Sequence, residues 1–190
     1  MGSFLVRTYA ARHGDDMDGF ILCGTAGNNP ALPVAKFIAK AEIKNKGATA
    51  QSKALNELSF GAYNKAFRPN RTEFDWLSVN EANVDGYVAD EECGYVFTAG
   101  GFSDLFDGLA EIGAKDWAKK VPIKPMLLIA GALDPVGAMG KGPREVEKSL
   151  TATGHDVKLI LYEGMRHEVH NENGKEQVYA DILSFLEAHI

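Results

Sequence analysis

The sequence has few cysteines, no long apolar run and no cluster of basic residues. Two cysteines, Cys23 and Cys93, are too few for a disulfide scaffold, and we expect both to be reduced and buried in a cytoplasmic protein. No stretch approaches the roughly 20 apolar residues of a membrane span, and residues 1–11 lack the apolar core of a signal peptide. Acidic residues outnumber basic ones by 26 to 20, so no nucleic-acid partner is expected.

The residues that are present fit one globular domain of mixed helices and strands. The 190 residues are 45% hydrophobic and 24% charged, which is ordinary for a folded protein with a sizeable core. Short apolar runs predict buried strands of a parallel sheet at residues 17–24, 126–134 and 157–162. Amphipathic patterns predict helices at residues 2–12, 142–154 and 174–190. The second of these helices is expected to have Pro143 at its first position.

A long insertion separates the first two predicted strands. It contains helical patterns at residues 34–40, 51–58 and 102–118, many aromatic residues and no convincing strand. The aromatic side chains either pack a core or face a substrate. We therefore predict a first core segment, an inserted helical segment that we call the cap, and a second core segment, at residues 1–28, 29–119 and 120–190.

An acid and a histidine each follow one of the later strands. Asp134 stands in a Gly-Ala-Leu-Asp-Pro turn, and His167 lies in the loop after the next strand. Asp before Pro commonly starts a turn, and a loop histidine is often only solvated. However, neighbouring parallel strands bring their carboxyl ends together, where α/β sheets place their chemistry. We therefore predict the two side chains within about 2.6–3.2 Å, as in a Ser…Asp…His triad.

The histidine loop also contains residues that could bind a metal, and the start of the chain contains a serine. A metal could be held by His167, His170 and Glu172, but the second histidine comes one residue too early for the His-Glu-x-x-His motif of zinc proteases. We therefore expect no metal, and we expect Glu168, His170 and Glu172 to support the site or lie on the surface. Ser3 has neither a strand nor a Gly-x pair before it, so it is not predicted to be a nucleophile.

Several segments resemble the monoglyceride lipases and lysophospholipase-like members of the α/β-hydrolase superfamily. Residues 1–4 (MGSF) resemble the end of the nucleophile elbow, residues 128–136 (LIAGALDPV) the acid strand, and residues 162–172 (YEGMRHEVHNE) the histidine loop. The cap is similar to that of bacterial members at residues 59–65, 74–78 and 93–98. The resemblance implies the carboxyl-terminal part of an α/β-hydrolase fold, with a parallel sheet flanked by helices and an inserted helical cap.

The resemblance also implies a serine hydrolase for monoacylglycerol-like or lysophospholipid-like esters, with no cofactor. Asp134 would be the triad acid and His167 the base, and Phe60 and Trp76 would line the substrate site. Met1 would hold the oxyanion-hole position, although as the first residue it carries an amine instead of an amide.

By the same resemblance, the family's first strands and its nucleophile serine precede Met1. We therefore expect this chain alone to be inactive. The alternative is a truncated or non-enzymatic binding module on the same fold. The strand at residues 17–24 would then have a bare edge, and we expect it to cause self-association or poor solubility.

Overall fold

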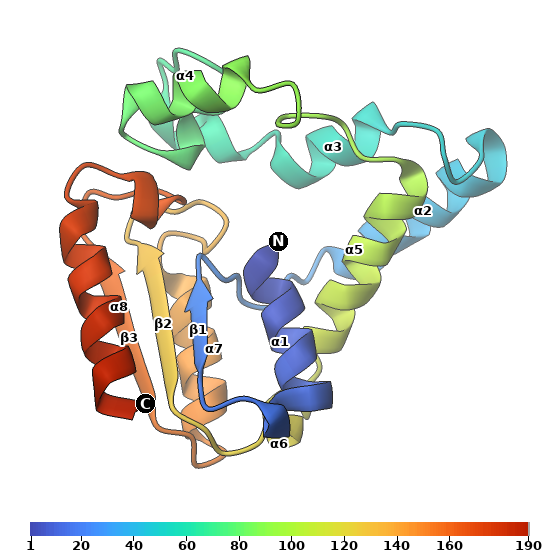
Figure 1. Ribbon diagram of the computed structural model, residues 1–190. Helices are drawn as coiled ribbons and strands as arrows, with labels where there is room; N and C mark the ends of the chain where they lie inside the picture. Colours follow the sequence, from blue (N-terminus) through green and yellow to red (C-terminus); the bar gives the residue numbers. More distant parts are fainter. Residues whose placement is uncertain (190) are drawn as a thin grey trace.

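The computed structural model describes residues 1–189 and is built around a parallel sheet of three strands (Figure 1). The strands lie in the order β1-β2-β3, with bounds Phe20–Cys23, Met126–Gly131 and Val157–Tyr162. All three strands were predicted, but β1 is shorter than expected and β2 ends three residues before Asp134. Leu22, Leu128 and Leu159 are in register across the sheet, so the three carboxyl ends lie at one edge.

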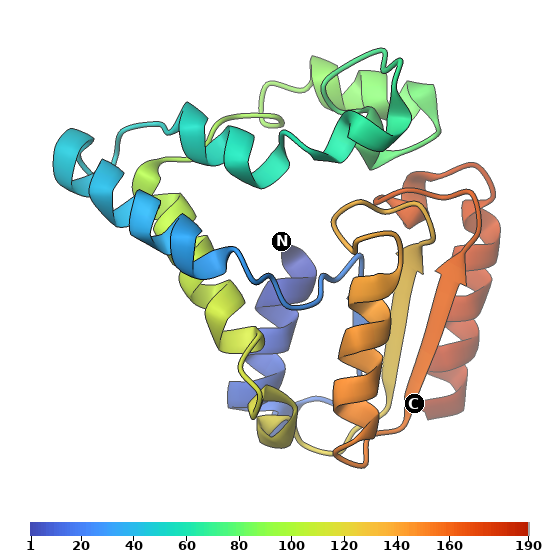
Figure 2. The same cartoon turned by 180° about the vertical axis from the view of Figure 1, so that it is seen from behind.

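Helices cover both faces of this sheet. Helices α1 and α7 pack on one face and α8 packs on the other (Figures 1 and 2). Their bounds, with that of the short helix α6, are α1 Gly2–His13, α6 Trp117–Lys120, α7 Lys141–Thr151 and α8 Lys175–His189. Ile190, the last residue of the predicted final helix, lies outside the described residues.

Helix α7 begins earlier than predicted. Its first residue is Lys141, so the prediction of Pro143 at the first position is wrong by two residues. The chain enters the helix through Gly140, whose φ of 80° is a conformation that glycine adopts at little cost. Pro143 is tolerated as the third helical residue because the amides of the first turn have no partner within the helix.

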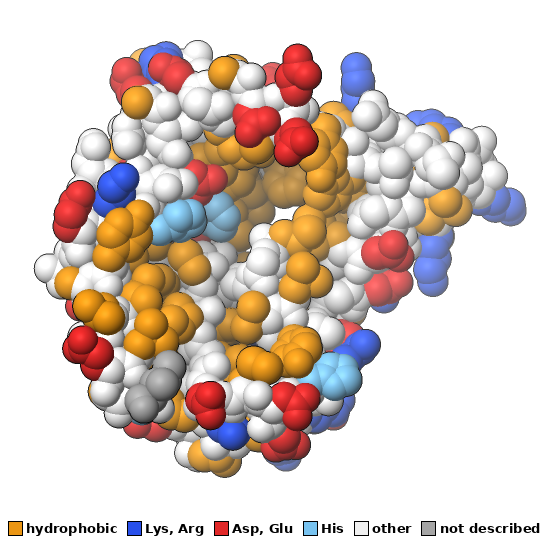
Figure 3. Space-filling view, in the orientation of Figure 1, with side chains coloured by type: hydrophobic (Ala, Val, Ile, Leu, Met, Phe, Trp, Pro, Cys, Tyr) orange, Lys and Arg blue, Asp and Glu red, His pale blue; other side chains and the backbone are white. Residues whose placement is uncertain are grey.

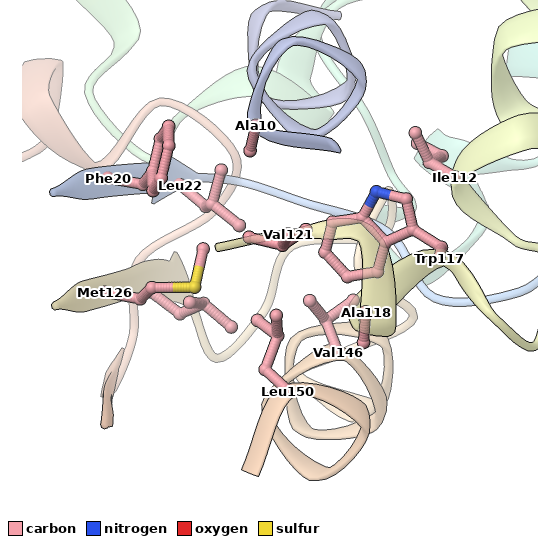
Figure 4. Close-up of a cluster of buried hydrophobic side chains, with 11 residues drawn as sticks. Ala10, Phe20, Leu22, Ile112, Trp117, Ala118, Val121, Met126, Val146 and Leu150 are labelled. Atoms are coloured by element: carbon pink, nitrogen blue, oxygen red, sulfur yellow. The ribbon is translucent and has the colours of Figure 1, made fainter. Parts of the chain in front are cut away.

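Alternate residues of each strand supply two apolar cores. Leu22 points towards α1 and α7, where it packs in one cluster with Leu150 of α7 (Figure 4). Leu128 belongs to the same cluster. Leu127 and Ile129 point the other way and pack against α8. Because both faces of β2 are buried, its sequence is a continuous apolar run without polar alternation.

The cap lies over the carboxyl ends of the strands. Helices α2 and α5 run side by side away from the core, and α3 and α4 complete the cap (Figures 1 and 2). Their bounds are α2 Leu32–Lys46, α3 Lys53–Phe60, α4 Glu81–Ala89 and α5 Ala99–Ile112. Short 3₁₀ turns lie at Gly14–Asp16, Tyr63–Phe67, Asp75–Leu77 and Val169–Asn171. The division at residues 28 and 119 stays a prediction.

Three details of the chain differ from the sequence-based expectations. The predicted helix at residues 102–118 is two helices, because α5 ends at Ile112 and α6 begins at Trp117. Helix α4 was not predicted. Both cysteines are free, as predicted, but each is partly exposed, since Cys23 ends an edge strand and Cys93 lies in a cap loop. Within residues 1–189, no helix is long and apolar enough to cross a membrane.

Candidate active site

The site lies beneath the cap, where two loops leave the carboxyl ends of β2 and β3. Asp134 follows β2 and His167 follows β3, and the Asp134 Oδ2 atom lies 2.9 Å from the His167 Nδ1 atom. The predicted separation is therefore confirmed. The Asp134 side chain is wholly buried, whereas the His167 side chain is 21% exposed. A buried acid thus contacts a histidine that remains open to the space under the cap.

The chemistry of the pair depends on which ring nitrogen of His167 is hydrogen-bonded to Asp134. A carboxylate at Nδ1 favours the tautomer with its proton on Nδ1, which leaves the lone pair on Nε2. Within residues 1–189 no hydrogen bond to the His167 Nε2 atom is formed, so this nitrogen is available as a base. The other Asp134 oxygen, Oδ1, accepts a hydrogen bond of 2.8 Å from the Val136 amide, which fixes the carboxylate in place.

Two glycines let the loops approach so closely. Gly24 directly follows β1 with a φ of 60°, and a Cβ atom there would come within 2.9 Å of the His167 ring. At Gly131, the last residue of β2, a Cβ atom would lie 2.0 Å from the carbonyl oxygen of Arg166. Neither position accepts a side chain without displacing the histidine loop. The two glycines therefore allow His167 to cross the sheet end and reach Asp134.

The first residue of the chain also lies in this site. Burial lowers the pKa of the Met1 amino group, while the negative charge of Asp134 acts in the opposite direction. Met1 precedes α1, so its amine stands at the positive end of that helix. Its role at the oxyanion hole stays a prediction. Burial raises the pKa of the neighbouring Cys23 thiol to about 11, so this thiol is protonated at neutral pH.

Ser3, His170 and Glu172 do not take part in the hydrogen bond between Asp134 and His167. Ser3 is buried on α1, and within residues 1–189 its hydroxyl forms no hydrogen bond with His167. His170 is exposed, and its carbonyl oxygen accepts a hydrogen bond from Tyr179. The Glu172 carboxylate is buried and accepts hydrogen bonds from protein donors alone in the part of the chain that the structure describes. No group of three metal-ligating side chains gathers among residues 1–189.

Three aromatic rings of the cap, which we call the aromatic row, form a chain of contacts that ends at His167. The ring of Phe60 lies 5.9 Å from that of Tyr63, which lies 5.0 Å from Trp76, and Trp76 lies 5.4 Å from the His167 ring. Phe60 and Trp76 were predicted as substrate-binding residues, and both line a cavity of about 460 Å³ within the cap. Tyr63 was not singled out. Burial, with a contribution from Asp134, raises its pKa to about 12.

A second, mostly apolar cavity of about 560 Å³ lies between α1, α5 and the segment at residues 95–98. The space-filling view shows hydrophobic side chains around the hollow between the cap and the core (Figure 3). Neither Asp134 nor His167 lines this cavity, but Met1 does, and the charge of Asp134 also reaches the Met1 amine. Met1 therefore connects the cavity to the acid–histidine pair.

The sequence pattern of one hydrolase family, described as serine aminopeptidase S33, matches residues 1–174. A thermostable carboxyl esterase from Bacillus coagulans, solved in complex with glycerol, is 31% identical with a TM-score of 0.92. A lipase solved in an open form is 28% identical with a TM-score of 0.85. In both cases the match covers 98% of this chain and 62% of the other.

A monoacylglycerol lipase from Paleococcus ferrophilus shares the fold, with a TM-score of 0.68, at 18% identity. That match covers 99% of this chain and 65% of the lipase. No curated protein matches the sequence. The chain therefore spans less than two thirds of the length of these solved structures.

Proposed function

Because this chain belongs to the serine aminopeptidase S33 family of α/β-hydrolases, we propose that it carries the acid and base of a Ser-Asp-His triad that hydrolyses carboxylic esters. The observation that carries the proposal is the hydrogen bond of 2.9 Å between the buried Asp134 and the partly open His167. His167 takes the serine proton through Nε2 and later gives it to the leaving alcohol, while Asp134 stabilises the imidazolium. The reaction uses no cofactor.

The nucleophile in this proposal is a serine encoded upstream of Met1. The amino group of Met1 is close enough to Asp134 for that charge to act on its pKa, which supports a site at the start of α1. In the family's nucleophile elbow, the serine stands between a strand and the helix that follows it. When the chain is extended, the Met1 nitrogen becomes an amide and can serve as an oxyanion-hole donor.

The substrates in this proposal are esters of fatty acids with small head groups, of the monoacylglycerol or lysophospholipid type. The cavity of about 560 Å³ beside Met1 accepts the acyl chain, because its lining includes Phe4, Leu105 and Leu109. The head group would lie in the cap cavity of about 460 Å³, which is lined by Phe60 and Trp76 of the aromatic row. This cavity also contains polar side chains such as Asn64 and Glu57.

The proposal is tested with a fluorophosphonate probe, which labels an activated serine. The 190-residue chain and a version extended upstream in frame through a Gly-x-Ser segment are each treated with the probe, digested and mapped. We expect labelling of the upstream serine in the extended protein and none in the shorter chain. Labelling of Ser3, or no labelling of the extended protein, contradicts the proposed nucleophile. The second result favours a non-enzymatic module.

Acyl-chain preference should respond to a side chain placed in the apolar cavity. Gly108 lies on α5 and lines this cavity, and a Cβ atom there meets nothing within 4 Å. We expect Gly108→Phe in the extended protein to lower kcat/KM for long-chain esters by about tenfold or more, since each buried methylene contributes about 0.8 kcal/mol. Short-chain esters should be affected little. The measurement is kcat/KM against acyl-chain length.

Gly86 provides a matched control for this substitution. It also lies within a helix, α4, where a Cβ atom would meet nothing within 4 Å, but it does not line the apolar cavity. Gly86→Phe should leave the chain-length profile unchanged. Equal losses for short and long esters in Gly108→Phe would count against the cavity as the acyl site.

The 190-residue chain alone should self-associate. Within residues 1–189, β1 has a partner strand on one side only, and Leu5 and Tyr9 on α1, with Met1 just before it, are exposed apolar side chains. A strand edge next to apolar surface favours pairing with another copy. Sedimentation equilibrium should therefore show dimers or larger species, and Leu5→Lys should reduce them. Phe37→Lys, at a more exposed residue of the cap, is the control and should change little. A monomer at high concentration contradicts this expectation.

A further inference from the structure

A buried carboxylate joins the histidine loop to the cap. Glu172 lies five residues after His167 and is 1% exposed. Its Oε2 atom accepts hydrogen bonds from the Ser78 hydroxyl at 2.7 Å and the Val79 amide at 3.0 Å. Its Oε1 atom accepts one of 2.7 Å from the amide of Arg166, the residue before His167. One side chain thus holds both a cap segment and the backbone next to the proposed base.

Further contacts run between the same two segments, which we call the cap anchor (residues 75–83) and the His167 loop (residues 163–174). The Arg166 guanidinium donates to the carbonyl oxygens of Asp75 and Ser78. On the other side of His167, the amide of Glu168 donates to the Leu77 carbonyl oxygen at 2.8 Å. The Glu168 carboxylate accepts a hydrogen bond of 2.7 Å from Asn83. Both sequence neighbours of His167 are therefore bonded to the cap anchor.

We propose that Glu172 is a positioning residue that makes the cap anchor and the His167 loop move as one unit. A buried carboxylate that loses its donors is left desolvated without partners, which costs more than losing an exposed hydrogen bond. The cap anchor therefore cannot lift away while Glu172 and the His167 loop stay in place. A cap movement that admitted substrate would therefore involve only cap residues outside the cap anchor.

This inference rests on the proposed function only for its consequence in catalysis. If His167 is the base, displacement of the cap anchor withdraws Nε2 from the reacting serine. The physical linkage itself is a property of the 190-residue chain. The linkage can be measured without any ester. One experiment therefore tests the linkage, and a different experiment tests the proposed function.

The test is Glu172→Gln in the 190-residue chain, followed by amide hydrogen exchange. A glutamine keeps the size of the side chain but turns an NH₂ group towards one of the donors, which breaks part of the network. We expect exchange at the Val79, Arg166 and Glu168 amides to accelerate by about tenfold to a hundredfold, with no change in β2. The control is Glu163→Gln, the same change at an exposed residue of the same loop.

A second readout separates positioning from a general loss of stability. The ¹⁵N and proton signals of His167 Nδ1 report its hydrogen bond to Asp134, and Glu172→Gln should shift or broaden them while Glu163→Gln leaves them unchanged. In an active extended protein, the same variant should lower kcat by about tenfold or more with little change in KM. Equal acceleration of exchange in β2 and the cap anchor, with unchanged His167 signals, overturns the proposal.

Ser78→Ala keeps the proposal testable if Glu172→Gln does not fold. It removes one donor to Glu172 and leaves the carboxylate and the Arg166 amide in place. We expect faster exchange at the Val79 and Arg166 amides, by a smaller factor than for Glu172→Gln. If the exchange of the Arg166 amide is unchanged when Ser78 is altered, the two segments are not coupled through Glu172.

Discussion

Replacing His167 by alanine in the extended protein is expected to lower kcat for a short-chain aryl ester by about 10⁴-fold or more. The serine proton then has no acceptor, because within residues 1–189 His167 is the only histidine bonded to the buried Asp134. Asp134→Asn should cost about 10⁴-fold, since an amide that donates to Nδ1 stabilises the wrong tautomer. Initial rates over a range of ester concentrations measure both effects.

The matched control for His167→Ala is His170→Ala. His170 lies three residues further along the same loop, and its side chain is exposed. Its removal should leave kcat within about twofold of the unchanged protein, as for other exposed loop residues. If His167→Ala keeps a tenth or more of the activity, or if His170→Ala loses as much, the assignment of the base to His167 is wrong.

The acid–histidine pair was predictable because it follows from topology. Two apolar runs separated by a helical pattern imply neighbouring parallel strands, and their carboxyl ends meet at one edge of the sheet. Asp134 and His167 each follow such a run, so a close approach was expected without knowledge of any side-chain position.

The role of Glu172 could not be predicted in the same way. The sequence places it near His167, and it was expected to support the site or lie on the surface. Its burial depends on Ser78 and Val79, which are more than 90 residues earlier in the chain. Neither hydrophobic periodicity nor motif spacing contains information about such a distant polar contact, so only the folded structure shows it.

Helix α4 was missed for a related reason. Its residues include Asn83, Asp85 and Gly86, which have low intrinsic helix propensity. The helix is held by tertiary contacts instead, because Val84 is buried and Asn83 donates to Glu168 in the His167 loop. A short helix stabilised in this way carries little signal in its own sequence.

The second large effect concerns Arg7, a buried cation on α1. Its guanidinium donates to the carbonyl oxygens of Ala26 at 2.9 Å and Ile112 at 2.7 Å, and it lies 4.3 Å from the centre of the Trp117 ring. Ile112 ends α5, so its carbonyl has no partner within that helix and is stabilised by a positive charge. Burial lowers the pKa of Arg7 to about 10, so the side chain is still charged at neutral pH.

We expect Arg7→Ala to lower the free energy of unfolding by about 3–5 kcal/mol, because it leaves the buried Ile112 carbonyl and the half-buried Ala26 carbonyl unpaired and a cavity beside Trp117. Arg12→Ala on the same helix is the control. Arg12 forms an exposed ion pair with Glu111, and such pairs contribute little to stability. Urea unfolding followed by Trp fluorescence measures both variants. A loss for Arg7→Ala no greater than that for Arg12→Ala would mean that the joint between α1, α5 and α6 does not depend on the buried guanidinium.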